Sequence, residues 1–192
     1  MNKKTVALTE EQYKEIIEII RSGFVCGDGH IVKPNNRIAT ALSLEANLGL
    51  RISDILRLSL NAIVHDGNRY RLDIVEKKTK KKREFTVPIE IYSYIQNYVL
   101  ENNINPASKL FPISERTVQN HLQMVCDYLN VDNVSTHSFR KYFASSIYVD
   151  NNYNIELVRV LLQHANVLTT QRYIGIGNKE IETALQNHIK LL

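Results

Sequence analysis

The 192-residue sequence has no tryptophan, only two cysteines, and no apolar run of the roughly 18 or more residues that a membrane helix needs. Cys26 and Cys126 are too few and too far apart in the chain for a disulfide framework. The first nine residues turn polar before the apolar region of a signal peptide could form. From these absences we expect a cytoplasmic protein without a membrane partner.

The composition is that of an ordinary globular protein. Hydrophobic residues make up 44% of the chain and charged residues 23%, which excludes disordered, collagen-like and low-complexity classes. The length is typical of one domain, so we expect residues 1–192 to form a single domain. The net charge of +4 permits a polyanionic partner without requiring one.

Positive charge is concentrated in one short segment. Six of the seven residues from Lys77 to Arg83 are Lys or Arg. Apolar and polar residues alternate over 69–74 and again over 85–87, so the basic segment is predicted to lie in a β-hairpin. Such a run is either a solvated hairpin tip or a nucleic-acid contact, and the charge alone does not decide between them.

The remainder of the chain is predicted to be mainly helical. Thr9 and Gln12 form a capping-box pattern at the start of the first helix, and Gly23 ends it. Segment 24–36 is predicted to be a loop, Asp66-Gly67 a turn, and Ser114 an N-cap. The further predicted helices cover residues 37–48, 52–60, 89–102, 115–129, 137–149, 155–163, 169–173 and 179–191. The expected fold class is α+β, mainly α, with one small antiparallel sheet.

Three polar residues fall at positions that suggest phosphate chemistry. His137 and Arg140 are three residues apart and so share a helix face. Arginine matches phosphate oxygens with a planar fork of donors, and histidine transfers protons near neutral pH. The plainer alternative is a capping histidine and a surface arginine. Arg51 follows Gly49 in an otherwise apolar corner between helices, where it needs an anionic partner.

A second candidate pair lies later in the chain, where Tyr173 follows His164 by nine residues. A tyrosine is usually a core or surface residue, and its pKa of about 10 makes the phenol a poor nucleophile. It becomes reactive only where cations stabilise the developing charge and a base takes the proton.

Taken in order, these segments resemble the catalytic domain of the tyrosine recombinase, or phage integrase, family. The matching stretches are 49–56, the lysine-rich hairpin before Val87-Pro88, 137–144 and 161–173. The resemblance implies a helical catalytic domain with a small antiparallel sheet over residues 1–192, without the N-terminal core-binding domain of most relatives. Gln163 stands where the family usually has glycine, and Asp54 matches a position that is often acidic.

The resemblance also implies roles for individual residues. Tyr173 would attack the scissile phosphate and form a 3′-phosphotyrosine. Arg51 and Arg140 would hold the two non-bridging oxygens. His137 would act as the general base, and His164 would hydrogen-bond the phosphate.

A hairpin lysine would protonate the leaving 5′ oxygen, and two candidates remain. Lys78-Thr79 resembles the Lys-Thr pair of family hairpins, which favours Lys78, whereas Lys80 stands eight residues before Pro88, a spacing that other members use. The other basic side chains would contact the DNA backbone: Lys77, Lys80, Lys81, Lys82 and Arg83.

The activity implied is site-specific recombination or integration of double-stranded DNA, as in mobile elements. The covalent intermediate would conserve the energy of the broken bond, so no ATP is expected to be needed. No metal is expected either, because Cys26 and Cys126 stand alone in the sequence. The expected assembly is a homotetramer on DNA, with a monomer as the state of the protein alone. Two alternatives are a nicking–closing enzyme of the type IB topoisomerase kind and a non-cleaving DNA-binding regulator of the same fold.

Overall fold

The computed structural model describes residues 5–175 and 186–188, and the backbone divides into two compact units, Met1–Phe143 and Ala144–Leu192. Each unit is described by itself, and the expectation of a single domain over 1–192 stays a prediction. Nearly all of the helix predicted for 179–191 lies outside the described residues. Of the helices that are described, none is both long and apolar enough to cross a membrane.

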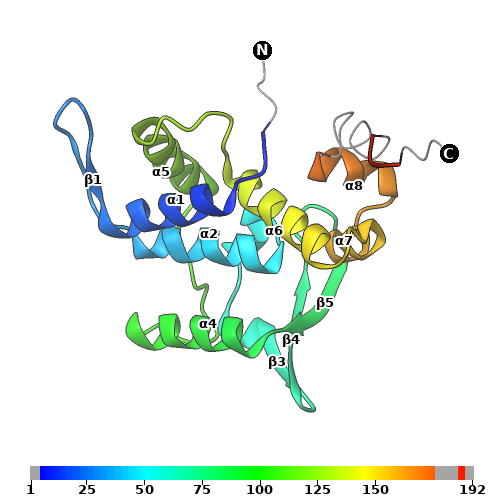
Figure 1. Ribbon diagram of the computed structural model, residues 1–192. Coiled ribbons are helices and arrows are strands. Elements are labelled where there is room, and N and C mark those ends of the chain that lie inside the picture. Colours follow the sequence, from blue (N-terminus) through cyan, green and yellow to red (C-terminus); the bar gives the residue numbers. More distant parts are fainter. Residues whose placement is uncertain (1–4, 176–185, 189–192) are drawn as a thin grey trace. The chain divides into compact units, whose positions relative to one another are not determined.

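Three helices of the first unit pack on one another: α1 (Glu10–Ser22), α2 (Asn36–Leu48) and α5 (Glu115–Tyr128) (Figure 1). The predicted capping box of α1 is confirmed, because the Gln12 N–H donates to the Thr9 hydroxyl at 3.2 Å and the Thr9 N–H donates to the Gln12 side chain at 3.0 Å. These helices bury the isoleucines and leucines of their inner faces and form a large part of the core.

A tight corner joins α2 to the next helix and sets the position of Arg51. Gly49 ends α2 in the left-handed conformation with φ of 59°. Arg51 has an extended backbone and is the N-cap of α3 (Ile52–Ile55). The helix predicted for 52–60 is therefore wrong in length, since Leu60 belongs to a separate 3₁₀ turn, η1 (Leu60–Ala62).

A three-stranded antiparallel sheet follows, with strand order β3-β4-β5. Its strands are β3 (Ile63–Asp66), β4 (Arg69–Val75) and β5 (Lys82–Val87), and α4 (Ile89–Glu101) contacts β4. The predicted Asp66-Gly67 turn is confirmed, because it joins β3 to β4. Strand β3 was not predicted from the sequence.

The loop predicted for 24–36 contains a second, two-stranded sheet. Strand β1 (Phe24–Val25) pairs with β2 (Ile31–Val32), and the Cys26 N–H donates to the His30 carbonyl at 2.8 Å. The expectation of one sheet is thus corrected to two. Strands of two residues carry no detectable alternation of polar and apolar positions, so the glycines between them dominated the pattern.

Helix α6 (Thr136–Asp150) begins in the first unit and ends in the second, which also contains α7 (Ile155–Leu162) and α8 (Val167–Ile174). Asn154 caps α7 and Asn166 caps α8, each by accepting a backbone N–H from three residues ahead. The Asn166 cap starts α8 two residues earlier than the predicted start at 169.

Replacing Gly49 by alanine should destabilise the first unit by about 2–5 kcal/mol. The left-handed backbone costs an L-residue about 1–2 kcal/mol, and forcing a methyl group into a filled space costs a further 1–3 kcal/mol. The methyl carbon would lie 2.4 Å from ring carbons of Phe143. Urea unfolding of the purified variant measures the loss.

Gly67→Ala is the matched control, because Gly67 has a similar φ of +61° but nothing within 4 Å of the added methyl group. Only the backbone strain of about 1–2 kcal/mol should remain in this variant. Equal losses in the two variants would show that contact between residue 49 and Phe143 is not what restricts position 49 to glycine.

Candidate active site

The anionic partner expected for Arg51 is the carboxylate of Glu76. Arg51 Nη1 donates to Glu76 Oε2 at 2.6 Å, and the Glu76 side chain is completely buried. The Arg51 side chain keeps 22% of its surface exposed. One edge of the guanidinium is therefore fixed, while part of the group still faces solvent.

The lysine-rich turn is attached to the same corner. Glu76 and Lys81 close the turn, with the Glu76 N–H donating to the Lys81 carbonyl at 3.0 Å, and Lys80 occupies the left-handed region with φ of 58°. Buried Asp54 of α3 accepts the Lys77 N–H at 2.7 Å. This bond ties the turn to the helix that Arg51 begins, which gives the acidic side chain at position 54 a structural role.

Lys80 and Lys81, two of the predicted DNA-contacting lysines, are exposed on the hairpin, and so is Lys78, the predicted general acid. Two further lysines carry ion pairs: Lys77 Nζ lies 3.2 Å from Glu115 Oε1, and Lys82 Nζ lies 2.6 Å from Glu84 Oε1. Such exposed pairs contribute little to stability and exchange readily for phosphate oxygens.

Arg83 differs from the surface contact expected of it. Only 2% of the side chain is exposed, and Nη1 donates to Glu76 Oε1 at 3.1 Å. Strand β5 explains the correction, because Arg83, Phe85 and Val87 alternate with exposed residues and share the inward face. Burial and the charge of Arg140 lower the pKa of Arg83 to about 10, although Glu76 opposes the shift.

Arg140 is buried on α6, with 1% of its surface exposed. The alternative of a surface arginine at this position is therefore wrong. Glu45 of α2 is fully buried and lies close enough for the positive charge of Arg140 to act on its carboxyl group. Burial raises the pKa of Glu45 well above its ordinary value, and Arg140 and the Ile52 backbone offset only part of that rise. Neither residue Glu45 nor its partnership with Arg140 was expected from the sequence.

His137 is where the predicted residues of the first unit converge. Desolvation by the surrounding protein and the charges of four cations lower its pKa from 6.5 to about 4: Arg140, Lys141, Arg51 and Lys78. The residue still presents surface to solvent, so it lies among cations without being enclosed. At neutral pH the imidazole is consequently neutral.

In the second unit, His164 and Tyr173 lie side by side. Gln163 ends α7 in the left-handed region with φ of 54°, so the turn expected of a glycine forms with glutamine. The rings of His164 and Tyr173 are 5.2 Å apart in an edge-to-face arrangement. His164 Nδ1 lies 3.0 Å from the hydroxyl oxygen of buried Thr170, which directs Nε2 away from that contact.

The predicted site thus falls into two clusters. The first unit brings together Arg51, Lys78, His137 and Arg140. The second unit brings together His164 and Tyr173. Sequence reasoning missed Glu76, although a single acidic residue between an apolar strand and a basic run was a signal for it.

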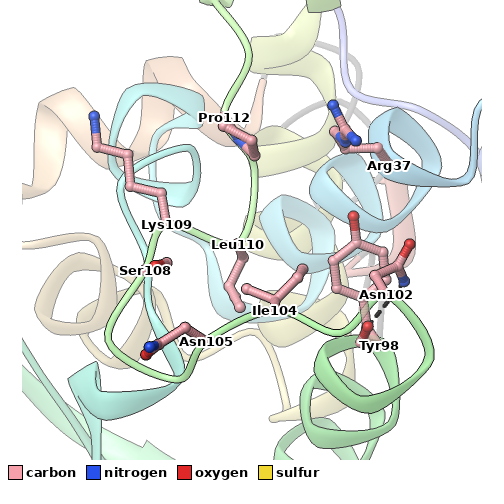
Figure 2. A pocket seen from close by; sticks show the side chains of 9 residues that line it. All are labelled: Arg37, Tyr98, Asn102, Ile104, Asn105, Ser108, Lys109, Leu110 and Pro112. Carbon is pink, nitrogen blue, oxygen red and sulfur yellow. Dashed lines mark hydrogen bonds between the residues drawn. The ribbon is translucent and has the colours of Figure 1, made fainter.

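A separate hollow of about 500 Å³ in the first unit contains none of these residues (Figure 2). Arg37 and Tyr98 face it from α2 and α4, Asn102 lies beside Tyr98, and lining residues between 104 and 112 complete the hollow. Within 5–175 and 186–188, no group of three or more His, Cys, Asp and Glu side chains is arranged to hold a metal ion.

Known proteins resemble this chain in sequence and in fold. The profile of the phage integrase family matches residues 7–180. A probable integrase/recombinase of Bacillus subtilis (strain 168), YoeC, is 30% identical over 163 residues, which cover 81% of this chain and 86% of YoeC.

Solved structures share the fold. The catalytic domain of bacteriophage HP1 integrase superposes with a TM-score of 0.63 at 18% identity, covering 96% of both chains. The XerH recombinase in a post-cleavage complex with its difH substrate gives a TM-score of 0.69 at 18% identity, covering 96% of this chain. This chain spans 53% of the XerH chain.

The chain therefore belongs to the phage integrase family, and its fold is that of a tyrosine recombinase catalytic domain. The expected fold class, mainly α with small antiparallel sheets, is confirmed. Its class of enzyme is the tyrosine-type site-specific recombinase.

The pKa of His137 in the free protein should lie near 4, because bringing a second positive charge among these cations is unfavourable. Titration of the ring by NMR measures it, with the resonance assigned by loss in His137→Gln. Arg51→Ala should raise the value, since one of the cations is removed. A value close to 6.5 in the wild type, with no change in Arg51→Ala, would contradict the clustering of these charges around His137.

Proposed function

We propose that this protein cleaves and rejoins double-stranded DNA at specific sites through a covalent 3′-phosphotyrosine on Tyr173. The arrangement that carries the proposal is His137 lying among the cations of Arg51, Lys78 and Arg140, with Arg51 held by the Glu76 carboxylate at 2.6 Å. A phosphodiester reaction needs positive charge where the phosphorane develops and a base for the incoming phenol. This cluster combines both.

In the proposed forward step, the phenolic oxygen of Tyr173 attacks phosphorus while the phosphorus–O5′ bond breaks. His137 takes the phenol proton, and Lys78 gives a proton to the departing O5′. Arg51 and Arg140 neutralise the non-bridging oxygens, and His164 donates a hydrogen bond to one of them. The reverse step uses a 5′ hydroxyl as nucleophile and releases the phenol, so no external energy source or metal is required.

DNA is proposed to lie against the hairpin, with Lys77, Lys80, Lys81 and Lys82 on phosphates of the backbone. Each phosphate that is neutralised should add about 0.9 to the slope of log affinity against log salt. Arg83 is left out of this set because its guanidinium is buried against Glu76. We further propose a homotetramer on DNA, since strand exchange joins four DNA arms, with a monomer as the state in the absence of DNA.

The first test is capture of the covalent adduct. Wild-type protein is incubated with nicked duplexes of random sequence, in which the short fragment released by cleavage diffuses away and prevents rejoining. We expect a denaturant-resistant protein–DNA complex whose modified peptide, identified by mass spectrometry, contains Tyr173. Tyr173→Phe should give none, because the phenyl ring has no nucleophilic oxygen.

The outcomes of this test separate the alternative activities. Binding without any adduct would indicate a non-cleaving regulator. The sequences enriched in the adduct supply the DNA site for all later measurements. Relaxation of supercoiled plasmids that lack such a site, at a rate matching plasmids that contain it, would indicate a nicking–closing enzyme instead.

The second test distinguishes Lys78 from Lys80 as the general acid. Lys78→Ala should slow cleavage by about 10²- to 10⁴-fold, the usual contribution of general acid catalysis. Sulfur in place of the bridging 5′ oxygen should restore the rate, because a thiolate leaves without being protonated.

Lys80→Gly is the matched variant, since glycine suits the φ of 58° at this position. It should lower the salt slope by about 0.9 while cleavage at saturating protein falls by no more than about threefold. The opposite pattern, in which sulfur rescues Lys80→Gly and leaves Lys78→Ala slow, would make Lys80 the acid.

A further inference from the structure

Glu76 occupies an unusual place for an acidic residue, at the entrance of the most basic segment of the chain. It directly follows strand β4, and none of its side chain is exposed. Three donors from three different positions reach its carboxylate: Arg51 Nη1 at 2.6 Å, the Thr79 hydroxyl at 2.7 Å and Arg83 Nη1 at 3.1 Å. The carboxylate therefore joins the α3 corner, the hairpin turn and strand β5.

The two carboxylate oxygens divide these contacts. Oε2 accepts from both Arg51 and Thr79, while Oε1 accepts from Arg83. Burial opposes ionisation, but the hydrogen bonds from Thr79 and Arg51 and the charges of Arg51 and Arg83 hold the pKa of Glu76 below its ordinary value. The group is thus an anion at neutral pH, and its bonds to the two guanidinium groups are charge-assisted.

We propose that Glu76 is a positioning residue that holds Arg51 and the turn carrying Lys78 in one fixed arrangement. This inference rests on the proposed function, in which Arg51 binds the phosphate and Lys78 protonates the leaving oxygen. Thr79 is the residue next to Lys78, and it shares Oε2 with Arg51. One carboxylate oxygen therefore anchors both the guanidinium group and the turn.

Preorganisation is the physical benefit of this arrangement. An arginine side chain loses about 2 kcal/mol of rotamer entropy when it is fixed, and Glu76 imposes that loss during folding rather than when the transition state forms. Because Glu76 takes one η nitrogen, the remaining donors of Arg51 are left for the phosphate oxygens. A purely structural reading, in which Glu76 only neutralises buried Arg83, predicts a loss of stability without a specific effect on Arg51 or Lys78.

The test uses full-length protein and the DNA site selected by adduct formation. Glu76→Gln keeps the shape of the side chain and removes its charge. We expect the single-turnover cleavage rate at saturating DNA to fall by about 10- to 100-fold, as for outer partners of functional groups, while DNA affinity changes by less than about threefold. In the Arg51→Ala background the same change should have a clearly smaller effect, because only the turn that carries Lys78 is left for Glu76 to position.

Thr79→Val tests the turn separately and is expected to fold, since Thr79 is exposed. It should slow cleavage of the ordinary substrate and regain the rate on the 5′-sulfur substrate, because only placement of the acid is disturbed. Glu76→Gln should regain only part of its rate on that substrate, because Arg51 remains misplaced. Glu84→Gln is the matched control: Glu84 also pairs with basic residues of the hairpin, but it is exposed and touches neither Arg51 nor Thr79.

The ordering of Arg51 provides a readout that does not need activity. The ¹⁵Nε relaxation of Arg51 in the free protein should report a rigid side chain in the wild type and in Glu84→Gln, and a mobile one in Glu76→Gln. An adduct-forming wild type with equal rates in Glu76→Gln, or equal losses with and without Arg51, would overturn the inference. Absence of any adduct in the wild type would overturn the proposed function instead, while Arg51 relaxation would still decide whether Glu76 orders that side chain.

Discussion

Repulsion between like charges is the constraint on which the first unit depends. Arg51, Arg83 and Arg140 are all close enough to affect one another or His137. Two unit charges 4 Å apart interact by about 4 kcal/mol near a protein surface. An apolar core alone could not hold such a group together, so the fold supplies buried carboxylates from two directions: Glu76 from the end of β4 and Glu45 from α2.

The two carboxylates do not compensate the cations completely. Glu76 is ionised and bound by two guanidinium groups, whereas burial raises the pKa of Glu45 well above its ordinary value. Burial and the charge of Arg140 lower the pKa of Arg83 despite Glu76, and the pKa of His137 is lowered as well. The cluster is therefore short of negative charge. A bound phosphate group would supply that negative charge. The uncompensated cations lower the stability of the free protein, and the same cations favour binding of a phosphate.

Features of the fold and site that depend on neighbouring residues could be predicted from the sequence, whereas features that depend on residues far apart in the chain could not. The Thr9 capping box and the end of the second helix at residue 48 follow from neighbouring residues and were predicted correctly. The burial of Arg83 depends on the register of β5, which places its side chain on the same face as Phe85 and Val87. Alternation continued back from residue 87 would have placed Arg83 inside. The general expectation that runs of charged residues are exposed favoured a surface position for Arg83, and this expectation was wrong.

Other features could not be read from local pattern at all. The buried carboxylate of Glu45 opposes Arg140 across two helices that are far apart in sequence, and no spacing rule connects them. The sharing of Glu76 between Arg51 and Arg83 likewise requires a strand and a helix corner to meet. In both cases the sequence shows the charges, whereas only the tertiary structure shows which charges are partners.

Strained backbone conformations also occur next to the residues of the candidate site. Among the described non-glycine residues with positive φ, four are asparagines, which tolerate that conformation, and the others are Lys80, Tyr153 and Gln163. Tyr153 packs its ring edge-to-face on Tyr148 at 5.3 Å. Lys80 and Gln163 instead lie beside the turns that present Lys78 and His164. Each would be less strained as glycine by about 1–2 kcal/mol, so both turns persist because the surrounding hydrogen bonds determine them, and the strain is located where the side chains proposed for the reaction must be held.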